Sequence, residues 1–299
     1  MRVLISGSTG FIGTALVKRL LELGHEPVRL VRSTSPDDVP SVRWDPAAET
    51  IDDGALDNID AVVHLAGESI ASSRWTDAQK ARIMDSRVKG TRTLAKAMAA
   101  AENPPAIFLS GSAIGYYGDT DDQHITEESA AADDFAALVT VAWEQEAAPI
   151  ATPRTRLAYL RTGIVLDPSG GALKEQLPFF KLGIGGRIGD GTQWFSWISL
   201  DDEVGAIIHL LENDVSGPVN LTAPNPVTNG AFTKALGRVL GRPTLLPTPT
   251  PALYLRLGKE LAQTLLLGGS RVSPTVLEAS GYEFTDPELE PALQRMLKG

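Results

Sequence analysis

The chain has 299 residues, of which 43% are hydrophobic and 21% charged, a composition typical of an ordinary globular protein. A net charge of −10 and the lack of any run rich in lysine and arginine argue against nucleic acid or an anionic membrane as a partner. There is no cysteine, and no two of the four histidines have metal-ligand spacing, so we expect no metal site. The first apolar run begins at residue 2 and none is long enough to span a bilayer, which predicts a cytoplasmic protein without a signal peptide.

Residues 1–165 alternate between short apolar runs and helical patterns. The runs show no strict in–out alternation, which is typical of strands buried on both faces. Helices are predicted after the first run and over residues 77–101, the second with Met84, Val88, Thr91, Ala95 and Met98 on one face. This order predicts an α/β protein with a doubly wound parallel sheet of the Rossmann type. The predicted strands are RVLIS (2–6), EPVRLV (26–31), DAVVHLAG (60–67), AIFLSGS (106–112) and LAYLRTGIVL (157–166).

After Asp167, glycine and proline become frequent and the alternation turns irregular. We expect residues 1–165 to form a nucleotide-binding domain and residues 166–299 a smaller α/β domain that covers the substrate, with the segment 196–223 returning to the first domain. Helices are predicted near 171–182, 201–212, 228–240, 251–267 and 287–297.

The stretch GSTGFIG follows the first predicted strand directly. Gly7 would allow a tight turn, Gly10 would let backbone N–H groups approach a pyrophosphate, and Gly13 would let the helix pack on the strand. The helix N-terminus then presents positive charge to the phosphates. A glycine-rich turn in an unrelated sheet is the alternative. The setting between a strand and a helix favours cofactor binding, and the predicted binding residues here are Gly7, Thr9, Gly10, Phe11, Ile12 and Gly13.

The end of the second strand distinguishes between cofactors. NAD-binding chains usually carry Asp or Glu there, whereas this strand ends at Arg32 with no carboxylate before Asp37. A guanidinium can pair with a 2′-phosphate but offers nothing to two ribose hydroxyl donors. Arg32 could instead be an ordinary surface residue. Its position predicts NADP(H) rather than NAD(H).

Several motifs together resemble the extended short-chain dehydrogenase/reductases of the epimerase/dehydratase type. They are GxxGxxG at Gly7–Gly13, HLAG at 64–67, LSGSAIGYYG at 109–118 and WISLDD at 197–202. More narrowly, SRVKGT at 86–91, GRIGDGTQWFSWI at 186–198 and a tail from about Asn229 look like an atypical subgroup that carries the label "epimerase family". The resemblance implies a Rossmann domain, a small C-terminal substrate domain and NADP(H). It adds Leu65, Ala66, Gly67 and Ile164 to the predicted cofactor-binding residues.

The same resemblance exposes a departure. The family's catalytic pair, Tyr-x-x-x-Lys, stands on the helix that here reads DDFAALVTVAWEQEA, residues 133–147. The tyrosine position falls near Phe135 or Ala136 and the lysine position near Thr140. None of these side chains can shuttle a proton or orient a nicotinamide ribose at neutral pH. The standard mechanism is therefore in doubt.

Two residues remain as catalytic candidates. Ser112 matches the family serine that hydrogen-bonds a substrate oxygen, although a serine satisfied at a strand end is an equally good interpretation. Tyr117 could act as a general acid, but it would need a neighbour that lowers its pKa, and no lysine lies in that segment. Packing of Tyr117 over the nicotinamide is the simpler interpretation.

Two arginines on the second helix could reach the cofactor. The helix that carries Arg82 and Arg87 is expected to start beside the end of the HLAG strand, so either arginine could reach the pyrophosphate or the 2′-phosphate. Pairing of Arg87 with Asp85 on the helix surface is the alternative. His64 reads as a packed strand histidine rather than a base. Glu68 is the carboxylate placed best near the cofactor, although pairing at the surface is its more ordinary fate.

Two further segments have open interpretations. The run DDQHITEES at 121–129 reads as a solvated loop or a lid. Trp194, Phe195 and Trp197 suit the wall of a ligand pocket as well as a domain core.

Two functions fit these observations. The first is an NADP(H)-binding epimerase or oxidoreductase that acts, without the usual Tyr/Lys pair, on an unidentified small polar substrate such as a nucleotide sugar. The second is a non-catalytic NADP(H) sensor or interaction protein linked to cell division. Either could be a monomer or a homodimer.

Overall fold

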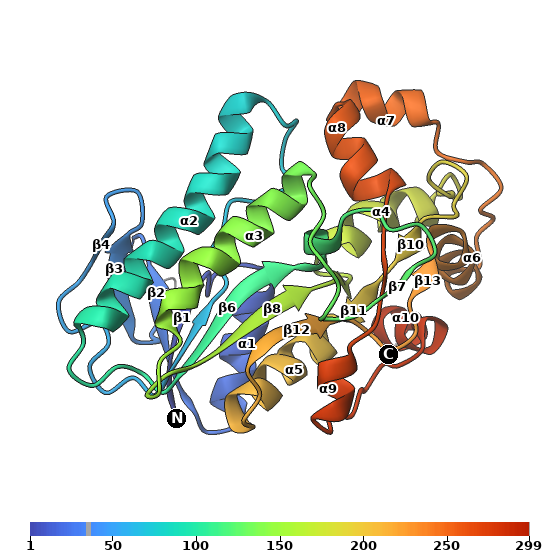
Figure 1. Cartoon of the computed structure of the whole chain (residues 1–299). Helices are drawn as coiled ribbons and strands as arrows, with labels where there is room; N and C mark the ends of the chain where they lie inside the picture. The colour runs from blue at the N-terminus through green and yellow to red at the C-terminus, as the bar shows by residue number, and fades with distance from the viewer. Residues whose placement is uncertain (34–36, 299) are drawn as a thin grey trace.

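The computed structural model describes residues 1–33 and 37–298 (Figure 1). An eight-stranded sheet runs through it in the order β12-β8-β6-β5-β1-β2-β3-β4, and every neighbouring pair is parallel except β3 and β4. Its central strands form because their apolar side chains are buried on both faces, as in β1 where Val3, Leu4 and Ile5 are fully buried. The strands are β1 (Arg2–Ser6), β2 (Glu26–Val31), β3 (Ser41–Asp45), β4 (Thr50–Ile51), β5 (Ala61–His64), β6 (Ile107–Ala113), β8 (Arg156–Thr162) and β12 (Gly217–Leu221).

The order of the strands reverses beside β1. The strands β2 and β3 extend the sheet on one side of β1, while β5, β6, β8 and β12 extend it on the other. This is the predicted doubly wound α/β fold of the Rossmann type. Ligands of such sheets bind outside the carboxyl ends of the strands at the reversal, here between β1 and β5.

Helices cover both faces of the sheet (Figure 1). α2 (Asp77–Ala100) and α3 (Phe135–Ala147) pack together on one face, and α1 (Phe11–Glu22) and α5 (Leu200–Glu212) pack together on the other. The buried residues of the second helix coincide only in part with the predicted face. Its buried stripe runs through Ile83, Thr91, Leu94 and Met98, whereas Met84, Val88 and Ala95 are only half-buried.

A second core lies beyond the end of β8. There Phe195 stacks on Phe232 with the ring centroids 4.4 Å apart, and Trp197 is fully buried, so the pocket-wall interpretation of these two aromatic residues was wrong. Only Trp194 is half-buried, with the Arg271 guanidinium over its ring. The elements around this core are β9 (Ile164–Asp167), α4 (Gly171–Lys181), β10 (Trp194–Phe195), β11 (Trp197–Ser199), β13 (Val227–Thr228), α6 (Asn229–Leu240) and α10 (Leu289–Lys298).

The C-terminal segment crosses back over the carboxyl edge of the sheet. β14 (Arg271–Val272) pairs with β7 (His124–Ile125), and Glu127 is buried, so the run 121–129 is fastened rather than being a wholly solvated loop. The single helix predicted over 251–267 is interrupted at Gly258, whose φ of 87° breaks helical geometry. The remaining elements are α7 (Thr250–Leu257), α8 (Lys259–Ala262), a π-helical turn η3 (Gln263–Leu267), α9 (Thr275–Ala279), and the 3₁₀ turns η1 (Ile114–Tyr117) and η2 (Ala148–Ile150).

Candidate functional site

The glycine loop forms one wall of the crevice between β1 and β5. A Cβ on Gly13 would lie 2.2 Å from the Gly7 carbonyl oxygen, and one on Gly7 would lie 2.8 Å from the backbone of Leu65. The loop is therefore in direct contact with the end of β5, and only glycine fits at these two positions. α1 begins at Phe11 behind Gly10, which offers no side-chain cap to the first N–H groups of the helix. An uncapped helix N-terminus beside a tight glycine turn has the chemistry of a phosphate cradle.

The remaining residues of the loop lie around this N-terminus. Thr9 and Gly10 are exposed, and Phe11 and Ile12 are half-buried. The Phe11 ring packs so closely on the turn before α4 that a Cβ on Gly170 would come within 2.3 Å of it. Ser8 Oγ is buried and has no hydrogen-bond partner among the described residues, so the cradle contains a hydroxyl whose hydrogen bonds the protein does not satisfy.

Arg29, which sequence reasoning missed, holds the backbone of the glycine loop. Its guanidinium donates to the Ser8 carbonyl oxygen and forms an ion pair with Asp37, 2.6 Å between Nη2 and Oδ2. Asp37, the first carboxylate after β2, is thereby engaged by a protein cation. Arg32 is exposed at the end of the same strand. The signal for Arg29 was a charged residue inside an apolar run, EPVRLV.

The HLAG turn forms the opposite wall. His64 is fully buried, with Nδ1 2.6 Å from Ser6 Oγ and Nε2 3.1 Å from Thr91 Oγ1, and burial lowers its pKa to about 3. It is the packed strand histidine that the sequence predicted. The next residues, Leu65 and Ala66, donate their N–H groups to Ser6, and Gly67 is exposed.

The two arginines of α2 differ in their surroundings. Arg82 is exposed and contacts Gln79. Arg87 is partly buried, and its Nη1 donates to the Glu68 carbonyl oxygen at 2.9 Å. The pairing of Arg87 with Asp85 was wrong, since the Asp85 carboxylate pairs with Lys89.

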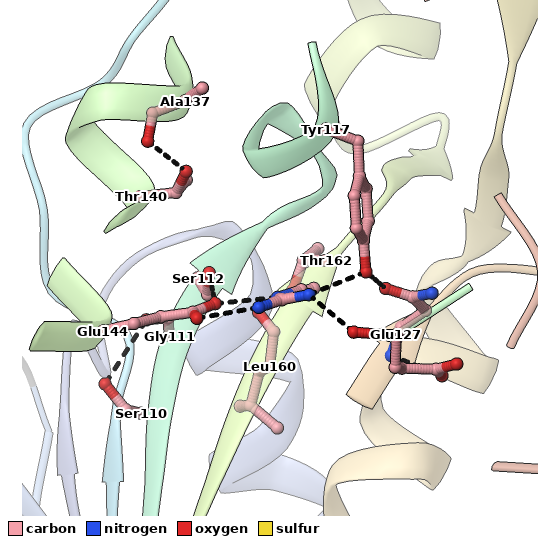
Figure 2. A network of polar contacts seen from close by, with 12 residues as sticks. Ser110, Gly111, Ser112, Tyr117, Glu127, Ala137, Thr140, Glu144, Leu160 and Thr162 are labelled. Carbon is pink, nitrogen blue, oxygen red and sulfur yellow. Dashed lines mark hydrogen bonds and ion pairs between the residues drawn. The ribbon is translucent and has the colours of Figure 1, made fainter. Parts of the chain in front are cut away.

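Ser112 belongs to a buried polar network between β6, β8 and α3 (Figure 2). Its hydroxyl donates to Glu144 Oε1 at 2.7 Å, and both Glu144 oxygens accept from the Arg161 guanidinium at 2.8 and 2.9 Å. A carboxylate held by a guanidinium in this forked geometry is ionised and can only accept. The single proton of Ser112 therefore points into the protein, and only lone pairs of its Oγ remain for another partner.

Tyr117 is a member of the same network (Figure 2). Only 1% of its surface is exposed; its hydroxyl donates to Asn220 Oδ1 at 2.7 Å and accepts from Arg161 Nη1 at 2.9 Å. Burial raises the pKa of Tyr117 to about 12 despite the neighbouring Arg161. General acid chemistry would need the opposite shift. Nearby, the Arg161 guanidinium lies 3.6 Å from the Tyr116 ring centroid.

The network continues to the C-terminal segment through Glu127. Its Oε1 accepts from the backbone N–H groups of Asn220 and Val276, and its Oε2 from the Thr275 hydroxyl. Arg161 also donates to the Glu127 carbonyl oxygen. Glu127, Glu144, Arg161 and Asn220 were all missed by sequence reasoning, because their partners lie 17 to 149 residues away.

The positions of the missing catalytic pair are filled by side chains without proton chemistry. The Thr140 hydroxyl donates back to the carbonyl oxygens of Ala136 and Ala137 within α3. The Phe135 ring packs against Trp75, with the centroids 4.8 Å apart. At these positions of α3, the side chains therefore contact the helix backbone and an aromatic ring.

An unexpected acid lies behind the end of β8. Glu203 of α5 is fully buried, accepts from Thr162 Oγ1 at 2.8 Å, and has no partner for Oε2 among the described residues. Burial raises its pKa to about 8, so it is protonated at neutral pH. Ile164, a predicted cofactor residue, begins β9 two residues after Thr162 and is half-buried.

Neither a bilayer-spanning helix nor a cluster of three metal-ligating side chains occurs in the part of the chain that the structure describes.

Two family models match the chain. Residues 3–140 match the NAD dependent epimerase/dehydratase family, and residues 248–296 match a domain of unknown function, DUF1731. The second match begins later than the tail expected from about Asn229.

Relatives match over nearly the full length. Epimerase family protein MT2273 of Mycobacterium tuberculosis is 41% identical over 292 residues, which cover 97% of this chain and 96% of the relative. The crystal structure of human epimerase family protein SDR39U1 with NADPH is 36% identical, with a TM-score of 0.92 and 99% of each chain covered. A nucleoside-diphosphate sugar epimerase from Corynebacterium glutamicum is 36% identical with a TM-score of 0.80, covering 99% of this chain and 58% of that one.

Proposed function

The chain belongs to the NAD dependent epimerase/dehydratase family, and we propose that it binds NADP(H) and acts as an epimerase or oxidoreductase on a small polar substrate. The observation that carries the proposal is the cradle between β1 and β5. There, an uncapped helix N-terminus follows a turn that only glycine can make, and the buried Ser8 Oγ has no partner. Backbone N–H groups and a positive helix end in this arrangement fit a dinucleotide pyrophosphate.

Arg32 and Asp37 support NADP(H) over NAD(H). A ribose with two free hydroxyls needs a carboxylate at the end of β2, and the first one after that strand, Asp37, is held by Arg29. Arg32 stands exposed at the strand end, where a guanidinium can pair with a 2′-phosphate. The NADPH in the human SDR39U1 structure supports the same choice.

The bound cofactor would supply or accept a hydride. The residues proposed to hold it are those of the glycine loop, the HLAG turn, Arg32 and Ile164, with Arg82 and Arg87 as flanking cations. Ser112 is the proposed contact for the substrate, and the lone pairs that its Oγ keeps suit a hydroxyl that donates. The name of the Corynebacterium relative makes nucleotide sugars the first substrate class to test. Tyr117 is the weaker catalytic candidate because its hydroxyl is buried and engaged.

A non-catalytic NADP(H) sensor or interaction protein is the second candidate. The observation that favours it is the satisfied network around Ser112 and Tyr117, in which the proton of each hydroxyl is already donated to a protein acceptor. Steady hydride transfer between NADP(H) and any member of a carbonyl and nucleotide-sugar panel would exclude the sensor. The absence of transfer across the panel, with intact NADP⁺ binding, would favour it.

Calorimetric titration of NADP⁺ and NAD⁺ tests the cofactor proposal. The wild type should prefer NADP⁺, and Arg32→Glu should weaken NADP⁺ by about 1.5–3 kcal/mol, the worth of a charged hydrogen bond, with little change for NAD⁺. Arg242→Glu makes the same charge change at an exposed position after α6, outside the sheet, and serves as the control. Equal affinity of the wild type for both cofactors would overturn the proposal.

A further inference from the structure

No described carboxylate lies within ion-pair distance of the Arg87 guanidinium, although the charge of Glu68 acts on it. The guanidinium donates to the carbonyl oxygens of Glu68 and Ile83. The Glu68 carboxylate turns instead toward Gln79 Nε2, 3.4 Å from its Oε1. A partly buried guanidinium of this kind attracts an anion, because its charge has lost water and no carboxylate contacts it directly. Burial also lowers the pKa of Arg87, to about 10.

The surroundings of Arg87 fix its place in the crevice. Its guanidinium lies 4.9 Å from the Trp143 ring, and a Cβ on Gly67 would come within 3.0 Å of it. The Trp143 ring in turn fills the space beside Gly111, where a Cβ would lie 2.7 Å from it. Gly67 follows β5 and Gly111 lies in β6, so the charge is held between the ends of these two strands.

This place is on the far side of the reversal from Arg32. The sheet order β2-β1-β5-β6 puts Arg32 at the end of β2 and Arg87 near the ends of β5 and β6. In a doubly wound sheet the adenosine half of a dinucleotide lies toward β2, and the other mononucleotide lies across the reversal. The two arginines therefore flank opposite halves of the crevice.

We propose that Arg87 binds the phosphate on the nicotinamide side of the dinucleotide, while Arg32 binds the 2′-phosphate on the adenosine side. This rests on the proposed NADP(H) binding and narrows the role of Arg87 to one of the two phosphate groups that the sequence left open. The Trp143 ring and the Glu68 carbonyl oxygen hold the fork in place, beside the exposed Gly67.

Three related ligands test this assignment by isothermal titration. NADP⁺ and 2′-phospho-ADP-ribose both contain the second phosphate, whereas 2′,5′-ADP lacks it. Arg87→Met should weaken the first two by a similar factor, roughly 10- to 100-fold for a charged hydrogen bond, and leave 2′,5′-ADP within about twofold. Arg32→Met should weaken all three.

Lys89→Met is the matched control. It removes one positive charge from the same helix, half a turn away, where the lysine pairs with Asp85, and it should leave all three affinities unchanged. If Arg87→Met fails to fold by thermal melting, Arg87→Lys replaces it. That variant keeps the charge without the fork and should show a smaller loss confined to the same two ligands.

The outcomes separate the two proposals. An equal loss of all three ligands with Arg87→Met, or no loss of any, would overturn the role of Arg87 while leaving NADP(H) binding intact. Loss of NADP⁺ alone would move Arg87 to the nicotinamide ring and equally overturn the assignment to the phosphate. Wild-type protein that binds none of the three would overturn the proposed function itself, and the inference with it.

Discussion

The two halves of the candidate site treat their polar groups in opposite ways. On the β1/β5 side, the α1 N-terminus has no side-chain cap, Ser8 Oγ has no partner among the described residues, and Arg32 is exposed. On the β6/β8 side, Ser112, Glu144, Arg161 and Tyr117 satisfy one another in a buried network. Polar groups left open are suited to a ligand, whereas mutually satisfied ones stabilise the fold. The difference indicates that the chain has kept the means of holding a cofactor more plainly than the means of using it.

Glu203 is an exception on the satisfied side, and it gives the largest expected effect. Its pKa is about 8 in the folded chain, where burial raises it, against 4.5 when unfolded. Between these values the folded state holds a proton that the unfolded state has lost, so the free energy of unfolding falls as pH rises from about 4.5 to 8. The full cost is on the order of 5 kcal/mol.

Urea unfolding of wild type and Glu203→Gln at pH 5, 7 and 9 measures this cost. The amide cannot ionise, so the variant should gain stability relative to wild type with each step in pH. Glu175→Gln, an exposed glutamate on α4, is the control and should follow the wild type. Parallel curves for wild type and Glu203→Gln would show that the acid is not held protonated.

His64 gives the opposite pH dependence on the cofactor side. Burial lowers its pKa from 6.5 to about 3, so the unfolded state takes up a proton below pH 6.5 that the folded state refuses. The stability it contributes is complete above pH 6.5 and is lost as pH falls toward 3, again on the order of 5 kcal/mol. His64→Gln should flatten this acid limb in urea unfolding at pH 4–7. His124→Gln, at an exposed position, should leave the limb in place, and an unchanged limb in His64→Gln would contradict the prediction.

Removal of Arg161 tests whether the network is structural. Arg161→Met leaves the Glu144 carboxylate buried without its cation, which should cost about 3–5 kcal/mol in the free energy of unfolding. Arg161→Met combined with Glu144→Leu should recover part of that loss, since no charge then remains buried. Arg238→Met breaks an exposed arginine–glutamate pair with Glu290 and should cost less than about 1 kcal/mol. Similar losses in the free energy of unfolding for the two arginines would mean that the buried network stabilises the fold no more than an exposed ion pair does.

Features that depend on neighbouring residues could be predicted from the sequence, whereas features that depend on contacts between distant segments could not. The core strands and the glycine turn were predictable because continuous apolar runs and a tight turn are local features. The predicted strand 157–166 is in fact two, β8 and β9, divided at Gly163, where a Cβ would lie 2.8 Å from the Ser196 carbonyl oxygen. That division depends on a segment more than thirty residues away. The two-residue strands β7 and β14 form only because they meet each other.

The network escaped prediction for the same reason. Glu144 in isolation reads as a solvated helix residue, and nothing local ties it to Arg161 or Ser112. The available signal was a charge within an apolar strand, as in LAYLRTG for Arg161 and EPVRLV for Arg29. A buried charge needs a partner, so each of these arginines predicts an unseen carboxylate. The structure provides Glu144 and Asp37.

Ser112 gives the smallest expected effect and the sharpest test of the boundary between the two halves. Ser112→Ala removes a hydrogen bond to the Glu144 carboxylate and should lower the free energy of unfolding by about 1.5 kcal/mol. Ser110→Ala removes a buried hydroxyl whose bond to Gly111 is long, at 3.3 Å, and should cost less. In the Arg161→Met background the cost of Ser112→Ala should change, because both residues share the Glu144 carboxylate. If Ser112 belongs only to the network on the β6/β8 side, Ser112→Ala should keep the wild-type affinity for NADP⁺ in calorimetry. A clear loss of affinity would place Ser112 in the cofactor site and contradict the difference between the two halves.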